Sequence, residues 1–181
     1  MIGPDRKWVP IQDLAPPSAS LVHRNFLAHW LNLRGENVMP SFSDIDPVNV
    51  PWALAYIFVV DALPDGDFVY RIAGSEIEDR YNRSLKGARV SEIMQAAGTR
   101  SILQRWAAVR DTPAGFYVES SHFSESGRIV EGERIVLPLG NDRLHTTHLI
   151  GITRFHSPST LNAHLLGDQQ VRSIQWASLV G

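Results

Sequence analysis

Cysteine is absent from this sequence, which excludes disulfide bonds, thiolate nucleophiles and every metal site with cysteine ligands. Lysine is almost absent as well, since Lys7 and Lys86 are the only lysines among 181 residues. The net charge is -2 and the isoelectric point lies near 6.4, so the sequence offers no strongly basic surface. Binding of nucleic acid through such a surface is therefore not expected.

Long apolar segments are missing too. The longest apolar run, Trp52 to Val60, is far shorter than the ~20 residues that a membrane-spanning helix needs. Residues 1–15 carry charges and prolines and lack the apolar stretch of a signal peptide. Because the missing cysteine also fits a reducing compartment, we expect a cytoplasmic protein without a membrane partner.

The composition predicts one folded domain with extensions at both ends. Apolar residues make up 44% of the chain and charged residues 20%, which suits a protein that buries a core. The length fits a single domain of ~100–200 residues. The hydrophobic pattern predicts an N-terminal extension with a flanking helix at 1–36, the domain itself at 37–155 and a weakly periodic C-terminal tail at 156–181.

A helix is predicted after the proline-rich start of the chain. Ser18 and Ser20 are suitable N-caps, and Gly35 is a suitable end. The apolar residues between them recur at helical spacing on one stripe, which comprises Val22, Phe26, Leu27, Trp30 and Leu33. This stripe either covers the chain's own sheet or pairs with the same helix of a second subunit in a twofold dimer.

Two strands, several helices and three further strands are predicted next. The apolar run at 55–60 indicates a strand buried on both faces, and the alternating run at 68–73 indicates its hairpin partner. A helix that starts at Thr99 or Ser101 then places an apolar stripe on one face. The remaining predicted elements are short helical turns at 74–93 and strands at 116–123, 128–139 and 146–155.

This element order predicts an α+β fold, in which a five-stranded antiparallel sheet has helices packed on one face and the N-terminal helix flanks it. It is also the element order of the PAS fold. The segment Phe68–Ile77 resembles a stretch of a PAS-like family found mainly in alphaproteobacteria, and the similarity extends from Trp30 to Phe155. Shorter matches are Pro40-Ser41, Asp46-Pro47, Leu85-Lys86-Gly87-Ala88 and Leu137-Pro138-Leu139. Phe42 departs from the pattern, which has a basic residue there.

The resemblance implies a sensory or regulatory domain that binds a small ligand between the sheet and the helices. It also implies signalling through a partner protein or through a homodimer. PAS-like domains bind haem, flavin, small acids or nothing, so the cofactor stays unknown. Many of them act mainly as dimerisation modules, and a ligand-free interaction module is therefore the alternative function.

Aromatic residues supply most of the candidate pocket, because ligand pockets are mainly apolar and aromatic with a few polar groups. Trp106 and Tyr81 are the strongest candidates, since they lie on the helical side and each brings a polar atom that needs a partner. The alternative is that the rings simply fill the core. The complete set of predicted ligand-pocket residues is Phe58, Tyr70, Tyr81, Trp106, Phe116, His122 and His148.

Three histidines on the last strands invite a metal or haem site. Residues three apart on a strand point to opposite faces, which argues against one metal bound by His145 and His148, so no metal site is expected. His148 shares its strand parity with Ile150 and Ile152 and is predicted to point inward. An inward histidine suits a haem ligand or a pH-sensitive switch.

The sequence predicts no enzyme and no catalytic residues. Ser120-Ser121-His122 lacks a nucleophile elbow, and the glycines form neither a dinucleotide fingerprint nor a phosphate loop. Charged residues of the strands fit cross-strand ion pairs on a solvated face better than an acid–base pair in a pocket. They are Glu119, Arg128, Glu131, Glu133 and Arg134. A small enzyme that uses His122 or His148 with a glutamate remains the least favoured hypothesis.

Overall fold

The computed structural model describes residues 7–93, 96–123, 129–158 and 171–180. Its helices are α1 (Leu21–Arg34), α2 (Ser75–Tyr81), α3 (Val90–Ile93) and α4 (Ala96–Asp111), with short 3-10 turns at Ile11–Asp13, Phe42–Asp44 and Pro47–Asn49. Its strands are β1 (Lys7–Trp8), β2 (Ile57–Ala62), β3 (Phe68–Ala73), β4 (Ala114–Phe123), β5 (Ile129–Leu139), β6 (His148–Pro158) and β7 (Val171–Ser178). Within these ranges no helix combines the length and the apolar character needed to cross a membrane.

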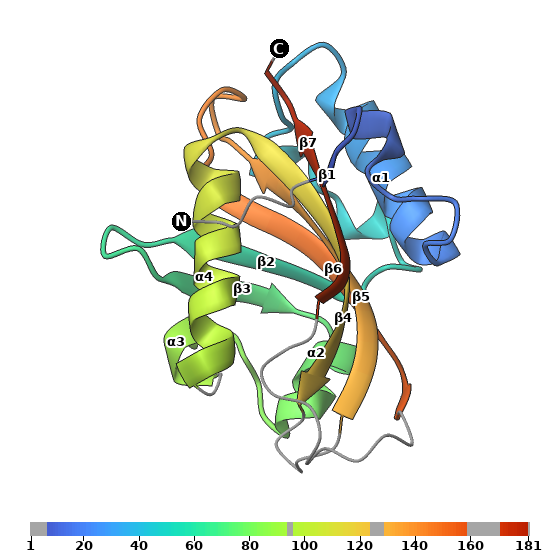
Figure 1. The fold of residues 1–181 in the computed structure, drawn as a ribbon. Helices are drawn as coiled ribbons and strands as arrows, with labels where there is room; N and C mark the ends of the chain where they lie inside the picture. Colours follow the sequence, from blue (N-terminus) through green and yellow to red (C-terminus); the bar gives the residue numbers. More distant parts are fainter. Residues whose placement is uncertain (1–6, 94–95, 124–128, 159–170, 181) are drawn as a thin grey trace.

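The described strands form one sheet in the order β1-β7-β4-β5-β6-β2-β3 (Figure 1). Neighbouring strands run antiparallel, except that β1 and β7 run parallel. The predicted α+β fold with a mostly antiparallel sheet is therefore confirmed, and the five predicted strands correspond to β2 through β6. The sheet is larger than expected because β7 and β1 extend it beyond β4.

The strand β7 lies in the segment that was expected to be a weakly periodic tail. It pairs along its length with β4, and Trp176 packs on Phe116 with 5.0 Å between the ring centroids. On the opposite face of β7, Gln175 donates a hydrogen bond from Nε2 to the carbonyl oxygen of Leu14 at 3.2 Å. The stretch from Val171 to Ser178 is thus part of the sheet rather than an appendage to it.

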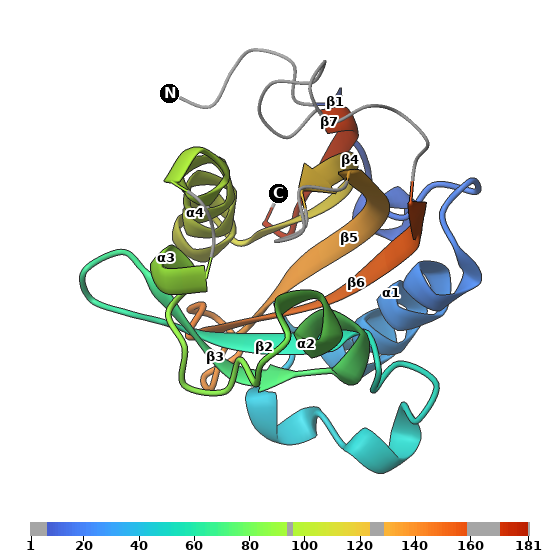
Figure 2. The same ribbon diagram turned by 90° about the horizontal axis from the view of Figure 1, so that it is seen from below.

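Helices cover both faces of the sheet, with α1 on one side and α3 and α4 on the other (Figure 2). Side chains alternate between the two faces along each strand. On β6, Ile150 and Ile152 belong to the core beneath α1, whereas Leu149 belongs to the core beneath α4. The helix expected merely to flank the sheet therefore covers a second core of its own.

The helix α1 forms as the sequence predicts, with Ser20 before it and Gly35 ending it at a φ of 55°. Its apolar stripe is buried against the chain's own sheet, where Phe26 and Trp30 lie in the core. The Trp30 indole also donates a hydrogen bond to the carbonyl oxygen of Pro138 at 3.2 Å. Of the two roles considered for this stripe, the structure shows the first, so it is not free to form a dimer.

The hairpin of β2 and β3 presents aromatic side chains to the α4 face. The pairing register shifts between Val59 and Val60, which leaves Arg71 as an extra residue on β3, and Tyr70 is buried while Ile72 is exposed. Phe58 approaches β6 closely at Gly151, where an added Cβ would lie 2.5 Å from the Phe58 ring and 2.3 Å from the Ile135 carbonyl oxygen. Glycine at this position is what admits the Phe58 ring to the space between sheet and helix.

Candidate functional site

Aromatic rings occupy the centre of the space between the sheet and α4. The Trp106 indole stacks on Phe58, with 5.3 Å between the ring centroids and 12° between the planes. It meets Phe68 edge-on at 5.4 Å and Tyr70 at 6.3 Å. All four side chains are buried. Trp106 therefore packs α4 against β2 and β3.

The position of Trp106 follows from the helical spacing of α4. Ile102, Trp106 and Val109 recur on one face of the helix, and all three are buried against the sheet. The helix comprises Ala96–Asp111 and thus includes residues ahead of the predicted start. The apolar stripe that the sequence indicates is thus the surface that faces the sheet.

Two further members of the predicted pocket lie at the margins of the same face. Phe116 of β4 is buried in the α4-side core, where it packs on Trp176. Tyr81, the last residue of α2, is half-buried and packs against this core. The structure therefore brings five of the seven predicted residues to one face of the sheet, namely Phe58, Tyr70, Tyr81, Trp106 and Phe116. That they contact a ligand stays a prediction.

His148 lies apart from these five residues, on the α1 face. It is buried, as its parity with Ile150 predicts, but that parity directs it away from α4. Its Nδ1 is 2.7 Å from Asp61 Oδ1, and its ring centroid is 5.2 Å from that of Phe42. His148 therefore does not share a face with the other five residues, because alternation does not tell which of two covered faces a residue occupies. That it contacts a ligand stays a prediction. The side chain of His122 lies outside the described residues.

One charged residue lies among the aromatic side chains. Arg134 of β5 faces α4, and only 5% of its surface is exposed. Its Nε donates a hydrogen bond to Thr153 Oγ1 at 2.8 Å, and its guanidinium carbon is 5.8 Å from the centre of the Phe58 ring. The prediction that Arg134 forms ion pairs on a solvated face is wrong. Arg134 lies two residues before Val136 on the same strand, and Val136 is buried beneath α4. This alternation is the sequence signal that places Arg134 on the α4 face.

A second arginine lies near Arg134. Burial, together with the nearby charge of Arg134, lowers the pKa of Arg105 on α4 to about 10. Burial also raises the pKa of Tyr70, an effect that Tyr81 strengthens and Arg134 opposes. These effects indicate that Arg134 lies near both Arg105 and Tyr70, and that Tyr81 lies near Tyr70. The α4 face thus combines an aromatic wall with two guanidinium groups and two phenol groups.

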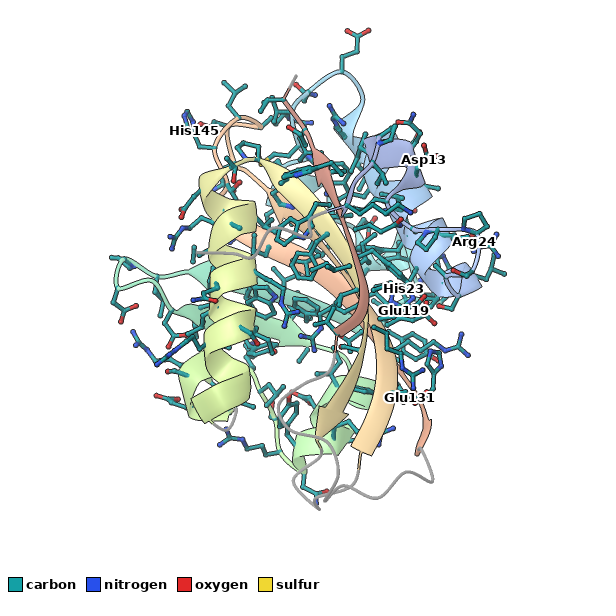
Figure 3. All side chains as sticks on the ribbon, viewed as in Figure 1. Asp13, His23, Arg24, Glu119, Glu131 and His145 are labelled. Carbon is teal, nitrogen blue, oxygen red and sulfur yellow. The ribbon has the colours of Figure 1, made fainter. Side chains whose placement is uncertain are left out.

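A separate polar network lies on the α1 face. Glu133 is buried, and its Oε2 accepts hydrogen bonds from the Ser20 backbone nitrogen at 2.8 Å and from the Tyr117 hydroxyl at 2.9 Å. His23 Nδ1 lies 2.7 Å from Ser20 Oγ and 3.5 Å from the same carboxylate oxygen. His156 Nε2 lies 2.9 Å from Glu133 Oε1. These contacts tie α1, on which His23 is labelled in Figure 3, to β4, β5 and β6.

The charges of this network differ from the solvated ion pairs that the sequence predicts. Burial lowers the pKa of His23 to about 4 against the opposing influence of Glu133, so the ring is neutral at pH 7. Burial alone would raise the pKa of Glu133, but the hydrogen bond from Ser20 and its other contacts lower it. Glu131, by contrast, does form an exposed ion pair, with Arg172 of β7.

The arrangement considered for a small enzyme is not found at His148. Its carboxylate neighbour is Asp61 and not a glutamate, and Asp61 also accepts hydrogen bonds from Arg71. Within the part of the chain that the structure describes, no three histidine, aspartate or glutamate side chains gather into a group that could hold a metal ion.

Comparison with known proteins gives one match to a family. A family model described as "PAS domain" matches residues 19–154, which run from just before α1 into β6. A search of curated proteins gives no match.

Several solved structures have a similar fold at low sequence identity. The VqmA dimer of Vibrio cholerae, studied in the absence of target DNA, aligns with a TM-score of 0.50 and 13% identity over 62% of this chain and 53% of that one. VqmA bound to DPO aligns with a TM-score of 0.48 and 15% identity over 57% and 52%. The PAS domain of a Colwellia psychrerythraea protein aligns with a TM-score of 0.45 and 17% identity over 60% of this chain and 95% of that one. The matched region spans about half the length of VqmA.

Proposed function

The chain belongs to the PAS domain family, and we propose that it is a sensory domain that binds a small ligand between its sheet and α4. In this role the ligand changes how the domain contacts a partner protein or a second copy of itself. The domain then works by binding rather than by catalysis. The surface that carries the signal is not the apolar stripe of α1, because that stripe is buried against the sheet.

The composition of the α4 face supports this proposal. Ligand pockets are typically lined by apolar and aromatic side chains, with a few polar groups that fix the orientation of the ligand. Phe58, Tyr70 and Trp106 supply the aromatic surface, and Arg134 with Thr153 supplies polar groups in the same region. The centre of the α1 face is different, because there Glu133 accepts a hydrogen bond from Tyr117 and lies beside His23, whose buried Nε2 has no partner among the described residues.

The indole nitrogen of Trp106 gives the strongest support for a ligand between the sheet and α4. The indole Nε1 of Trp106 is buried and has no hydrogen-bond partner in the structure as described. Buried tryptophan N–H groups usually find an acceptor, and leaving such a donor unsatisfied costs about 1–3 kcal/mol. An acceptor atom of a bound ligand would remove that cost, at the centre of the aromatic wall.

A ligand-free interaction module is the second candidate, and one observation favours it. The stacking of Trp106 on Phe58 puts aromatic side chains in direct contact, as in a core that needs no ligand. In that case the chain acts through dimerisation or through a partner alone. The dimer named for VqmA is a property of that protein, and the same assembly here is part of the proposal.

Native mass spectrometry of the purified protein distinguishes the two candidates. We expect a mass above that of the chain, which falls to the chain mass on denaturation as the ligand is released. A visible absorption spectrum of the same sample would identify a coloured cofactor. If the native spectrum shows only the chain or its dimer, and no small molecule raises the melting temperature, the interaction module is the correct function.

A further inference from the structure

We propose that the site between the sheet and α4 takes a ligand that carries a carboxylate group, bound by the guanidinium of Arg134. The inference rests on the proposed function, since it assigns a chemical class to the ligand of the same site. It follows from the burial of Arg134, from the hydrogen bonds that this residue makes, and from the charges around it.

The charge of Arg134 is buried without a carboxylate at ion-pair distance among the described residues. Its described contacts are the hydrogen bond to Thr153 and the approach to the Phe58 ring. Glu133, the neighbour on β5, faces α1 and bonds to Tyr117 instead. A buried charge is costly unless it is paired and hydrogen-bonded, so this guanidinium calls for an anion.

The geometry of the hydrogen bond to Thr153 limits how that anion binds. Because Nε of Arg134 is engaged by Thr153 Oγ1, the two terminal nitrogens of the guanidinium are the donors that remain for a ligand. These two nitrogens present parallel N–H groups that match the two oxygens of a carboxylate in an end-on pair. Thr153 therefore orients the guanidinium group of Arg134, and the two terminal nitrogens of this group bind the carboxylate of the ligand.

The surroundings favour the same class of ligand. Burial and the charge of Arg134 lower the pKa of Arg105, so the guanidinium groups of these two residues lie near each other and their like charges repel. A carboxylate beside Arg134 would offset that repulsion. The stacked rings of Phe58 and Trp106 offer apolar surface next to the charge, which suits an acid with an apolar or aromatic body.

The test compares acids with their neutral amides on the wild-type protein. Phenylacetate and butyrate are titrated by calorimetry and by thermal denaturation, beside phenylacetamide and butyramide. The acids are expected to bind at least about tenfold more tightly than the amides, because hydrogen bonds to a charged group are the stronger ones. This comparison needs no variant and does not depend on whether a variant folds.

Variants then identify the residue that holds the acid. R134Q is expected to weaken binding of the acids by at least about tenfold, and R134K to weaken it less, since lysine keeps the charge but loses the fork. The matched control is R154Q. Arg154 is exposed, lies opposite Glu133 in the register of β5 and β6, and points away from α4. R154Q is expected to bind the acids like the wild type.

Each outcome bears on one of the two claims. Equal binding of acids and amides would overturn the carboxylate class and leave the proposed function intact. An equal loss in R134Q and R154Q would overturn the role of Arg134. If none of the four probes binds but the native mass spectrum shows a released molecule, a carboxylic acid there supports the inference and a molecule without an anionic group overturns it. A native spectrum of the bare chain, with no probe bound, would remove the proposed function as well.

Discussion

Replacing Trp106 by alanine is expected to lower the free energy of unfolding by about 3–5 kcal/mol. The side chain is buried and makes ring contacts with Phe58, Phe68 and Tyr70, so its removal leaves a cavity where three elements meet. A typical domain is stable by only about 5–15 kcal/mol, and the loss would be a large part of that. Urea denaturation followed by circular dichroism measures the difference.

Two further variants show whether the effect belongs to this position. Trp106→Phe keeps an aromatic ring and removes the unpartnered N–H, so it is expected to cost less than the alanine variant. Trp52→Ala removes a partly exposed tryptophan on a loop and is expected to change stability by less than about 1 kcal/mol. Equal losses in Trp106→Ala and Trp52→Ala would show that Trp106 does not fasten α4 to the sheet.

Acidification is expected to destabilise the protein through His23, by on the order of 3 kcal/mol between pH 6.5 and pH 4. Burial depresses the pKa of His23 in the folded state to about 4, below the value of 6.5 in an unfolded chain. In this window the unfolded chain therefore binds a proton that the folded chain does not, and stability falls as the pH falls. Above pH 6.5 and below pH 4 this contribution no longer changes with pH.

The variant His23→Gln separates this effect from the titration of the carboxylates. Its stability is expected to depend less on pH between 4 and 6.5 than that of the wild type, whatever its absolute value. Glu133 has a lowered pKa in the folded state, so the stabilisation that it contributes is present above its ordinary pKa and is lost as the pH falls through the lowered value. Chemical denaturation at a series of pH values gives both slopes. An unchanged slope in the variant would contradict the burial of a neutral His23.

The two faces of the sheet differ in the polar groups that are buried on them. On the α1 face, Glu133 is bonded to Ser20 and Tyr117, and these contacts fix the helix in place. On the α4 face, Arg134 and Trp106 keep polar atoms for which the described chain supplies no full set of partners. His23 of the α1 face also has a buried ring nitrogen, Nε2, without a partner among the described residues. The difference between the faces therefore lies in the aromatic rings and the guanidinium group of the α4 face, which support the proposed ligand site.

Elements with a local signal were predictable from the sequence. The N-cap, the apolar stripe and the terminal glycine define α1, and the spacing of Ile102, Trp106 and Val109 defines the buried side of α4. The hairpin of β2 and β3 followed from the apolar run at 55–60 and the alternation at 68–73. These signals lie within a few residues of one another, so they do not depend on how the chain folds back on itself.

Features that depend on distant partners were not predictable in this way. Glu133 and Arg134 are adjacent on β5 and are both buried, because the helices cover both faces. The partner that stabilises Glu133 comes from Ser20, 113 residues away. The strand β7 pairs with β4, and its Trp176 packs on Phe116; no periodicity within the C-terminal segment predicts these contacts.

A crystal structure of the protein as purified tests the central claim most directly. The account predicts electron density that the chain does not explain, between the sheet and α4, within hydrogen-bonding distance of Trp106 Nε1 or of the terminal nitrogens of Arg134. A carboxylate at the Arg134 fork would support both proposals. If groups of the chain itself satisfy Trp106 Nε1 and Arg134, and the aromatic rings close on one another with nothing between them, the claim of a ligand site is contradicted.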